Sequence, residues 1–225
     1  MPPLILASSS PRRKELLALT GLPFIILPAN VEENPEPDED PGVCVVRLAE
    51  LKMRAALELA NRMGFTRDQI ILSSDTIVTY QNKILGKPKD AQDARRMLEL
   101  LRGQVHQVLT AIHLARVDSS AIVTDVCVSD VTMRNYSDEE IALYIASEDP
   151  LDKAGAYAIQ NGTFHPVETF SHCYASVMGL PLCHITRSLN KMGMKIYEDI
   201  PVVCQHSLKY TCPVYAAILE DSGAK

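Results

Sequence analysis

The sequence predicts a mixed α/β fold, because strand-like and helix-like segments follow one another and an antiparallel pair of strands stands in the middle. The pair comprises residues 105–117 and 121–134, two long strand-like stretches that the polar Asp118-Ser119-Ser120 joins. Such a pair favours a mixed sheet over a purely parallel, doubly wound one. The length of 225 residues, of which 47% are hydrophobic, predicts one domain with ample material for a buried core.

The first part of the chain begins with a strand signal followed by a helix signal. Residues 4–7 are an apolar run typical of a short buried strand. Ser10 suits the N-cap of a helix and Pro11 its first position. Residues 28–42 are rich in proline and acidic side chains and predict a loop, whereas residues 43–63 return to helical spacing.

The remaining elements are predicted with the same signals. Ser137 and Glu140 form a capping-box pattern, which marks the start of a helix. The expected elements are a strand at 69–80 with a central aspartate, a turn at 81–83, a helix from Asp90 to about Leu101, the antiparallel pair, the helix after Ser137, a strand at 154–160 and a last helix at 181–191. Residues 195–225 give no clear pattern.

Composition narrows the classes of function. The net charge of −6 argues against general nucleic-acid binding through a basic face, although a local cluster of cations can still bind a small anion. No run of 18 apolar residues occurs, so no membrane span is expected, and without a signal-peptide pattern the expected compartment is the cytoplasm. The six cysteines form no CxxC pair, which is typical of free thiols, and the spacing of Cys204, His206 and Cys212 is poor for zinc.

An anion-binding pattern lies where the first strand passes into the first helix. Ser8, Ser10, Arg12 and Arg13 surround the free N–H groups of the first helical turn, where the macrodipole contributes about half a positive charge. A polyphosphate needs more cations, and both arginines can fork onto its oxygens. Two other interpretations fit this stretch alone: a capped surface helix with solvated arginines, and a kinase target at Ser10.

Four stretches together, in their order and spacing, resemble the Maf family of septum-formation-inhibitor homologues. They are LASSSPRRKELL, SSDTIVTYQNKILGKP, QVHQVLTAI and DPLDKAGAYAIQ. The resemblance covers about residues 4–189. It implies a nucleoside triphosphate pyrophosphatase that releases a monophosphate and pyrophosphate, with the elongated, cleft-bearing mixed sheet of the inosine triphosphate pyrophosphatases. On this basis we expect a Maf-like domain at 1–192, a C-terminal extension of unassigned role at 193–225, and a homodimer, since family members are often dimers.

The resemblance assigns a catalytic set. Asp75 matches the family's catalytic acidic residue, Glu33 its second acidic residue, and Lys52 and Lys87 its lysines near phosphate. Asp75 is informative by itself, because it interrupts an apolar strand, in which burying an unpaired charge is costly. Taken alone, it could instead cap N–H groups at a strand end, and Lys52 alone would be a solvated helix lysine.

A divalent metal, Mg²⁺ or Mn²⁺, is expected as cofactor, with Glu33 and Asp75 as its ligands. An ordinary aspartate titrates near a pKa of about 3.9 and is a weak base. We therefore expect Asp75 to bind the metal and orient the attacking water, and the family's assignment as proton acceptor remains compatible. Glu36, Asp38, Glu39 and Asp40 are expected to be solvated loop charges.

Base specificity in the family follows three positions, which are Arg12, Thr76 and Gln160 here. This combination resembles the branch that acts on dTTP and UTP, including modified pyrimidine nucleotides, and differs from the branch that acts on 7-methyl-GTP. A glutamine amide offers both a donor and an acceptor to a pyrimidine edge. Thr76 and Gln160 could alternatively satisfy local backbone groups.

The sequence also departs from the family pattern. Asn161 stands where a glycine is common, and residues 170–174 replace an asparagine-glycine turn, which puts base preference in question. His165 and His172 are expected on the surface. The alternative function is a nucleotide-binding regulator of cell division without turnover, but the intact acidic and basic set favours turnover. A nucleotidyltransferase would need a glycine-rich loop near the N-terminus, and SSSPRR has no glycine.

Overall fold

The computed structural model describes residues 2–220 and is built on one mixed β-sheet. Within these residues the strand order is β2-β1-β3-β5-β6-β7, and β4 pairs with β3 outside this path. The strands are β1 (Leu4–Leu6), β2 (Phe24–Ile26), β3 (Ile70–Tyr80), β4 (Lys83–Leu85), β5 (Val105–Arg116), β6 (Ile122–Met133) and β7 (Val167–Thr169). β1 runs parallel to β2 and β3, and the other pairings are antiparallel, so the predicted mixed sheet is confirmed.

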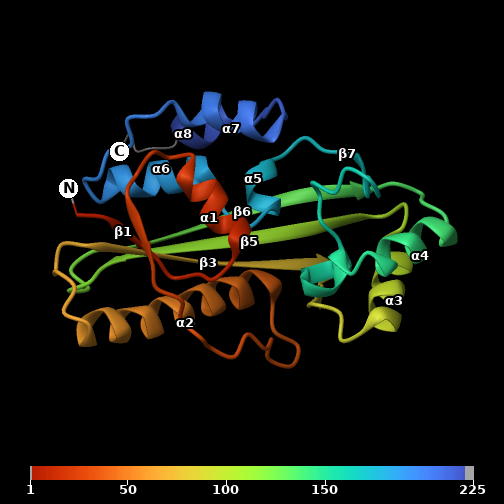
Figure 1. The fold of residues 1–225 in the computed structure, drawn as a ribbon, viewed down its shortest axis with the longest axis horizontal. Helices are drawn as coiled ribbons and strands as arrows, with labels where there is room; N and C mark the ends of the chain where they lie inside the picture. The colour runs from red at the N-terminus through yellow and green to blue at the C-terminus, as the bar shows by residue number, and fades with distance from the viewer. Residues whose placement is uncertain (1, 221–225) are drawn as a thin grey trace.

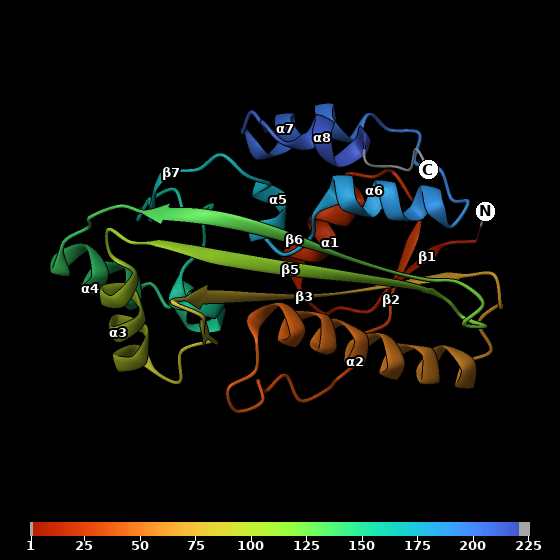
Figure 2. The same cartoon turned by 180° about the vertical axis from the view of Figure 1, so that it is seen from behind.

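Helices cover both faces of the elongated sheet. They are α1 (Pro11–Ala18), α2 (Pro41–Arg62), α3 (Ala91–Leu101), α4 (Asp138–Ala146), α5 (Tyr174–Val177), α6 (Leu182–Lys191), α7 (Ile200–Leu208) and α8 (Tyr215–Glu220). The long α2 lies along one face, α1 and α6 lie on the other, and α7 and α8 form a further layer above α6 (Figure 1). The view from behind shows α3 and α4 together at one end of the sheet (Figure 2). No helix within residues 2–220 has the length and apolar character needed to cross a bilayer.

Side-chain caps explain where the predicted helices begin. Ser10 accepts a hydrogen bond from the Arg13 N–H at the start of α1, and Ser137 and Glu140 form the expected capping box of α4. Asp40 accepts hydrogen bonds from the N–H groups of Gly42 and Val43, with Oδ1···N distances of 2.9 and 3.2 Å, and so starts α2 at Pro41. The predicted loop therefore ends two residues earlier than expected.

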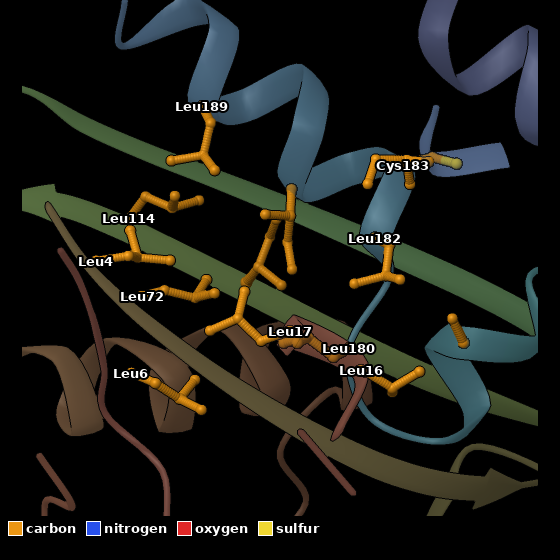
Figure 3. Packing of buried hydrophobic residues seen from close by; sticks show 14 of the residues in the cluster. Leu4, Leu6, Leu16, Leu17, Leu72, Leu114, Leu180, Leu182, Cys183 and Leu189 are labelled. Atoms are coloured by element: carbon orange, nitrogen blue, oxygen red, sulfur yellow. The ribbon is translucent and has the colours of Figure 1, made fainter. Parts of the chain in front are cut away.

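The core occupies both sides of the sheet because β1 is covered on both faces. Leu4 and Leu6 pack with Leu16, Leu17 and α6, whereas Ile5 packs against α2. Figure 3 shows the first of these clusters, in which side chains of β1, β3 and β5 meet those of α1 and α6. This arrangement fixes the end of β1 and the start of α1, between which the serines of the predicted anion site lie.

Two expectations are wrong. Residues 154–160 do not form a strand but a short 3₁₀ turn, η2 (Ala154–Ala156), because Gly155 and Ala156 have left-handed backbone with φ of +70° and +59°. A Cβ on Gly155 would lie 2.9 Å from Val78 Cγ1, so only glycine fits this close approach to β3. The helix at 181–191 is not the last, since α7 and α8 follow it. Residues 221–225 of the expected extension lie outside the described part.

Candidate active site

A cleft of about 320 Å³ opens beside the N-terminus of α1. Its walls come from the β1–α1 connection, β3, the segment around η2 and the residues that follow α5. The predicted site residues all line it, namely Ser8, Ser10, Arg12, Arg13, Glu33, Lys52, Asp75, Thr76, Lys87 and Gln160. Arg12 and Asp75, which lie far apart in the sequence, thus face one common space.

The N-terminal turn of α1 is joined to the rest of the cleft through Arg13. Its guanidinium donates from Nε to the Gly179 carbonyl at 3.0 Å and from Nη2 to Thr76 Oγ1 at 3.4 Å. Burial lowers the pKa of Arg13 below its ordinary value, and the nearby carboxylates of Asp75 and Glu33 act in the opposite direction. Arginine stays charged in proteins, so Arg13 supplies a fixed cation at the helix N-terminus.

Arg12 is held more loosely than Arg13. Its Nη1 lies 4.0 Å from Asp152 Oδ2, and the two side chains are 33% and 71% exposed. Such a solvent-screened pair contributes little to stability. Because Arg12 lines the cleft rather than an outer helix face, its guanidinium can turn toward a bound anion.

Lys52 lies between the two predicted catalytic acids. Its Nζ is 3.0 Å from Glu33 Oε1 and donates a short hydrogen bond to Asp75 Oδ1. Lys52 and Asp75 are each 4% exposed, whereas the Glu33 side chain is 46% exposed. A buried carboxylate needs such a partner, because burying a charge without one is very costly.

The simpler alternatives for these two residues are therefore wrong. Asp75 sits inside β3, paired with Ala111 of β5, and not at a strand end. Lys52 is buried rather than solvated, since α2 turns it toward the sheet. The second lysine, Lys87, is exposed on the loop after β4 and faces the same cleft.

Thr76 is held by side chains and not by backbone groups. Its hydroxyl accepts from Arg13 and lies 2.9 Å from Thr110 Oγ1, which in turn donates to the Ser176 carbonyl at 2.8 Å. Since Thr110 uses its proton for Ser176, Thr76 must donate to Thr110. Gln160 is exposed at the rim of the cleft, after η2.

The acidic pair can hold a divalent cation of the expected kind. Both carboxylates converge on one ammonium group, so their oxygens lie close together at the cleft wall. Carboxylate oxygens suit Mg²⁺ and Mn²⁺, and Mg²⁺ commonly takes one or two carboxylates and completes its shell with phosphate oxygens and water. Among residues 2–220 no group of three or more His, Cys, Asp or Glu suits a metal ion.

Sequence reasoning missed several residues of the cleft. Lys153 is buried there and donates to Asp149 Oδ1 at 3.0 Å and to Asp152 Oδ1 at 2.6 Å. The signal that could have identified it is a lysine directly before the largely apolar run AGAYAI, within one of the stretches that resemble the family. The other missed residues form an apolar wall and include Val78, Val108, Tyr157, Ile159 and Met178.

The acidic loop before α2 also differs from expectation. Glu39 is not a solvated charge, because Arg47 donates to both its carboxylate oxygens at 2.6 Å. These hydrogen bonds lower the pKa of Glu39 to about 2. Asp40 is engaged as the cap of α2. Both residues shape the loop that carries Glu33 toward Lys52.

The fold and the cleft define a class of α/β protein that is suited to a polyphosphate. Two arginines at the start of α1 and two carboxylates line this cleft together, and an apolar wall stands beside them. The chain belongs to the Maf family: the family described as Maf-like protein matches residues 3–192. The resemblance in the sequence is thereby confirmed.

Several curated relatives are named dTTP/UTP pyrophosphatase. A dTTP/UTP pyrophosphatase of Citrifermentans bemidjiense is 45% identical over 190 residues, which cover 84% of this chain and 95% of the relative. The dTTP/UTP pyrophosphatase of Escherichia coli K12 is 46% identical over 184 residues, covering 81% of this chain and 89% of the relative. That of Thermomicrobium roseum is 39% identical and covers 95% of this chain and 94% of the relative, so its match extends beyond residue 192.

Proposed function

We propose that the chain is a nucleoside triphosphate pyrophosphatase that hydrolyses dTTP, UTP and related modified pyrimidine nucleotides to the monophosphate and pyrophosphate. The observation that carries the proposal is the meeting of Asp75 and Glu33 at Lys52, in the same cleft as Arg12 and Arg13. Relatives named dTTP/UTP pyrophosphatase support the substrate class.

The cationic side of the cleft binds the triphosphate. Ser8, Ser10 and the Arg12 N–H in the first turn of α1 contact phosphate oxygens, and Arg12 and Arg13 neutralise their charge. Lys87 adds a cation from the loop after β4. Phosphoryl transfer depends mainly on positioning and charge stabilisation, so these groups provide most of the transition-state stabilisation.

The acidic side of the cleft acts on the water. The water oxygen forms a new bond to phosphorus, the anhydride bond between the α and β phosphates breaks, and the leaving oxygen keeps its electron pair. Asp75 orients this water, and its carboxylate is available to accept the proton that the water loses. Lys52 holds Asp75 in place and balances the charge of the acidic pair.

Glu33 and Asp75 are the proposed ligands of Mg²⁺ or Mn²⁺. A bound ion would contribute Lewis-acid stabilisation of the phosphate charge. Thr76 and Gln160 read the base, and the apolar wall with Val78, Val108 and Ile159 packs against its ring.

We also propose that the enzyme is cytoplasmic and that it forms a homodimer. All six cysteines are free thiols, which supports a reducing compartment. The edge strand β2 exposes Ile25 and Ile26, at 37% and 39%, which supports contact with a second copy. Light scattering of the purified protein gives the molar mass that tests the dimer.

The decisive experiment measures pyrophosphate release from a panel of natural and modified triphosphates with Mg²⁺ or Mn²⁺. We expect dTTP and UTP to be hydrolysed faster than GTP and 7-methyl-GTP. Tight nucleotide binding without pyrophosphate release would contradict the proposed enzyme and favour the alternative function, a nucleotide-binding regulator. Release of inorganic phosphate instead of pyrophosphate would place the cleavage at another bond.

A further inference from the structure

The C-terminal extension contacts Phe170 and Tyr174, which precede the residues of the same segment that line the cleft. Tyr210, which follows α7, donates a hydrogen bond from its hydroxyl to the Phe170 carbonyl at 3.2 Å. Its ring centroid lies 5.2 Å from that of Tyr174 and 5.6 Å from that of Phe170. Phe170 and Tyr174 complete the group with an edge-to-face contact at 6.0 Å. We call Phe170, Tyr174 and Tyr210 the aromatic cluster.

The extension holds Tyr210 in a defined position. The Tyr210 N–H donates to the Gln205 carbonyl at 3.2 Å, and the Cys212 N–H donates to Gln205 Oε1 at 2.9 Å. The second helix of the extension, α8, is tied to α6 by Arg187, whose Nη1 donates to the Ile218 carbonyl at 3.1 Å. Tyr210 therefore belongs to a segment that is packed and hydrogen-bonded against the rest of the protein.

Through Tyr174, the aromatic cluster is connected to the cleft by the helix α5 and the residues that follow it. Tyr174 is the first residue of α5, and Gly179, two residues beyond its end, lines the cleft. The Gly179 carbonyl accepts hydrogen bonds from Arg13 Nε at 3.0 Å and from Ser74 Oγ at 3.1 Å. The Ser176 carbonyl, inside α5, accepts from Thr110 Oγ1, which bonds Thr76.

The helix α5 needs outside support to keep these carbonyls in place. It has four residues, a single turn, and isolated helices shorter than about 12 residues are marginal in water. Its N-cap, Cys173, makes no capping hydrogen bond from its side chain. Packing against the rest of the chain must therefore fix α5: Ala175 and Ser176 are buried where α5 lies against β5 and β6, and the aromatic cluster adds packing at the first residue, Tyr174.

We propose that Tyr210 is a positioning residue of the cleft. It holds Tyr174 and α5, and α5 in turn places the Gly179 and Ser176 carbonyls that orient Arg13 and Thr76. The C-terminal extension thereby sets the affinity for the triphosphate and the discrimination between bases. The choice of substrate in this inference rests on the proposed function.

The kinetic test compares Tyr210→Ala, Tyr210→Leu and Tyr210→Phe with Tyr197→Ala, a control in the extension whose side chain is 89% exposed. We expect Tyr210→Ala to raise KM for dTTP and UTP by roughly 2- to 30-fold, the range for residues coupled to a site without touching its ligand. The turnover number should change little, and the ratio of dTTP to GTP hydrolysis should fall. Tyr210→Phe keeps the ring and should stay near the wild type, and Tyr197→Ala should equal it.

Hydrogen exchange provides a readout that needs no activity. The N–H groups of Met178, Gly179 and Leu180 donate to carbonyls of residues 174–176, at distances of 3.2, 2.8 and 2.9 Å. These amides should exchange faster in Tyr210→Ala than in Tyr197→Ala. Tyr210→Leu retains apolar volume and should shift exchange and KM in the same direction, which keeps the test usable where Tyr210→Ala does not fold.

The outcomes separate the two proposals. A wild type that hydrolyses no triphosphate contradicts the proposed function, while the exchange of residues 178–180 still decides the role of Tyr210. Exchange and KM in Tyr210→Ala and Tyr210→Leu that match Tyr197→Ala would overturn the inference.

Discussion

Lys52 in α2 and Asp75 in β3 form a buried ion pair, with the Lys52 ammonium also 3.0 Å from Glu33. The pair connects α2, which lies on one face of the sheet (Figure 1), to β3, whose residues Asp75, Thr76 and Val78 line the cleft. Removing one partner of a buried pair usually costs about 3–5 kcal/mol, because the other charge is left uncompensated. Here the third member, Glu33, can still compensate Lys52 when Asp75 loses its charge.

Asp75→Asn should therefore abolish turnover without unfolding the protein. Asparagine keeps the size of the side chain and an oxygen for Lys52, but it cannot accept the proton of the water. Loss of a general base lowers rates by about 10²- to 10⁴-fold. Pyrophosphate release and the melting temperature are the two measurements, and Asp118→Asn on the exposed β5–β6 connection is the matched control. Full rate in Asp75→Asn would remove Asp75 from the mechanism.

Arg12→Ala and Arg13→Ala should have different consequences. Arg12 is held only by a screened contact with Asp152, so its loss should raise KM by about tenfold, equivalent to one charged hydrogen bond, and leave stability unchanged. Arg13 is bonded to Gly179, Thr76 and Ser8, so its loss should raise KM and also destabilise the fold by about 1–3 kcal/mol. Steady-state kinetics and urea unfolding measure both effects. An unchanged KM in Arg12→Ala would restore the solvated-arginine interpretation.

Gln160→Ala should change which base is preferred. Gln160 is exposed at the rim of the cleft, so its removal leaves the fold intact. Loss of a hydrogen bond to a substrate edge costs about 0.5–1.5 kcal/mol, which is a change of about 2- to 10-fold in the ratio of dTTP to GTP hydrolysis. Competition between the two triphosphates in one assay measures this ratio directly. Gln104→Ala, exposed on the connection before β5, is the control.

Local sequence signals were sufficient to predict many of the helices and strands. The β-branched run at 69–80 predicted β3 to within a residue, and the caps at Ser10 and Ser137 marked two helix starts. The prediction failed at 154–160, where alternating small and apolar residues resemble a strand. The left-handed backbone of Gly155 depends on its approach to Val78, a contact 77 positions away that no local pattern reveals.

The site was predictable as a set of residues but not as a geometry. The resemblance to the family named the acids and cations, and the structure places them in one cleft. That Asp75 is paired with Lys52, rather than capping a strand end, follows from the packing of α2 on β3. The helices α7 and α8 were missed because short helices draw their stability from tertiary contacts that the sequence does not display.

Metal removal tests the acidic pair without mutation. Lys52 compensates Glu33 and Asp75 even when no cation is bound, so a chelator should leave the melting temperature of the nucleotide-free protein unchanged. The same chelator should abolish pyrophosphate release, and added Mg²⁺ or Mn²⁺ should restore it. Undiminished turnover after exhaustive chelation would contradict the proposed metal site.

Acid should destabilise the protein through His106. Its Nε2 lies 2.8 Å from the hydroxyl of Tyr157, a residue of the cleft wall, and the side chain is 2% exposed. Burial lowers the pKa of His106 to about 4, although the charge of Asp130 acts in the opposite direction. An unfolded histidine has a pKa of about 6.5. Between these values the unfolded chain binds a proton that the folded chain does not, so stability falls as the pH drops from about 6.5 toward 4.

His106→Gln should remove this part of the acid sensitivity. At pH 5 the contribution amounts to about 2 kcal/mol, since each pH unit in the window is worth about 1.4 kcal/mol. Burial also lowers the pKa of His113, which acts in the same direction in both proteins and cancels in the comparison. The measurement is the free energy of unfolding at pH 7.5 and pH 5 for the wild type, His106→Gln and His206→Gln, the last being an exposed histidine of α7. An equal loss of stability in the wild type and His106→Gln would mean that His106 does not remain neutral in the folded protein at pH 5.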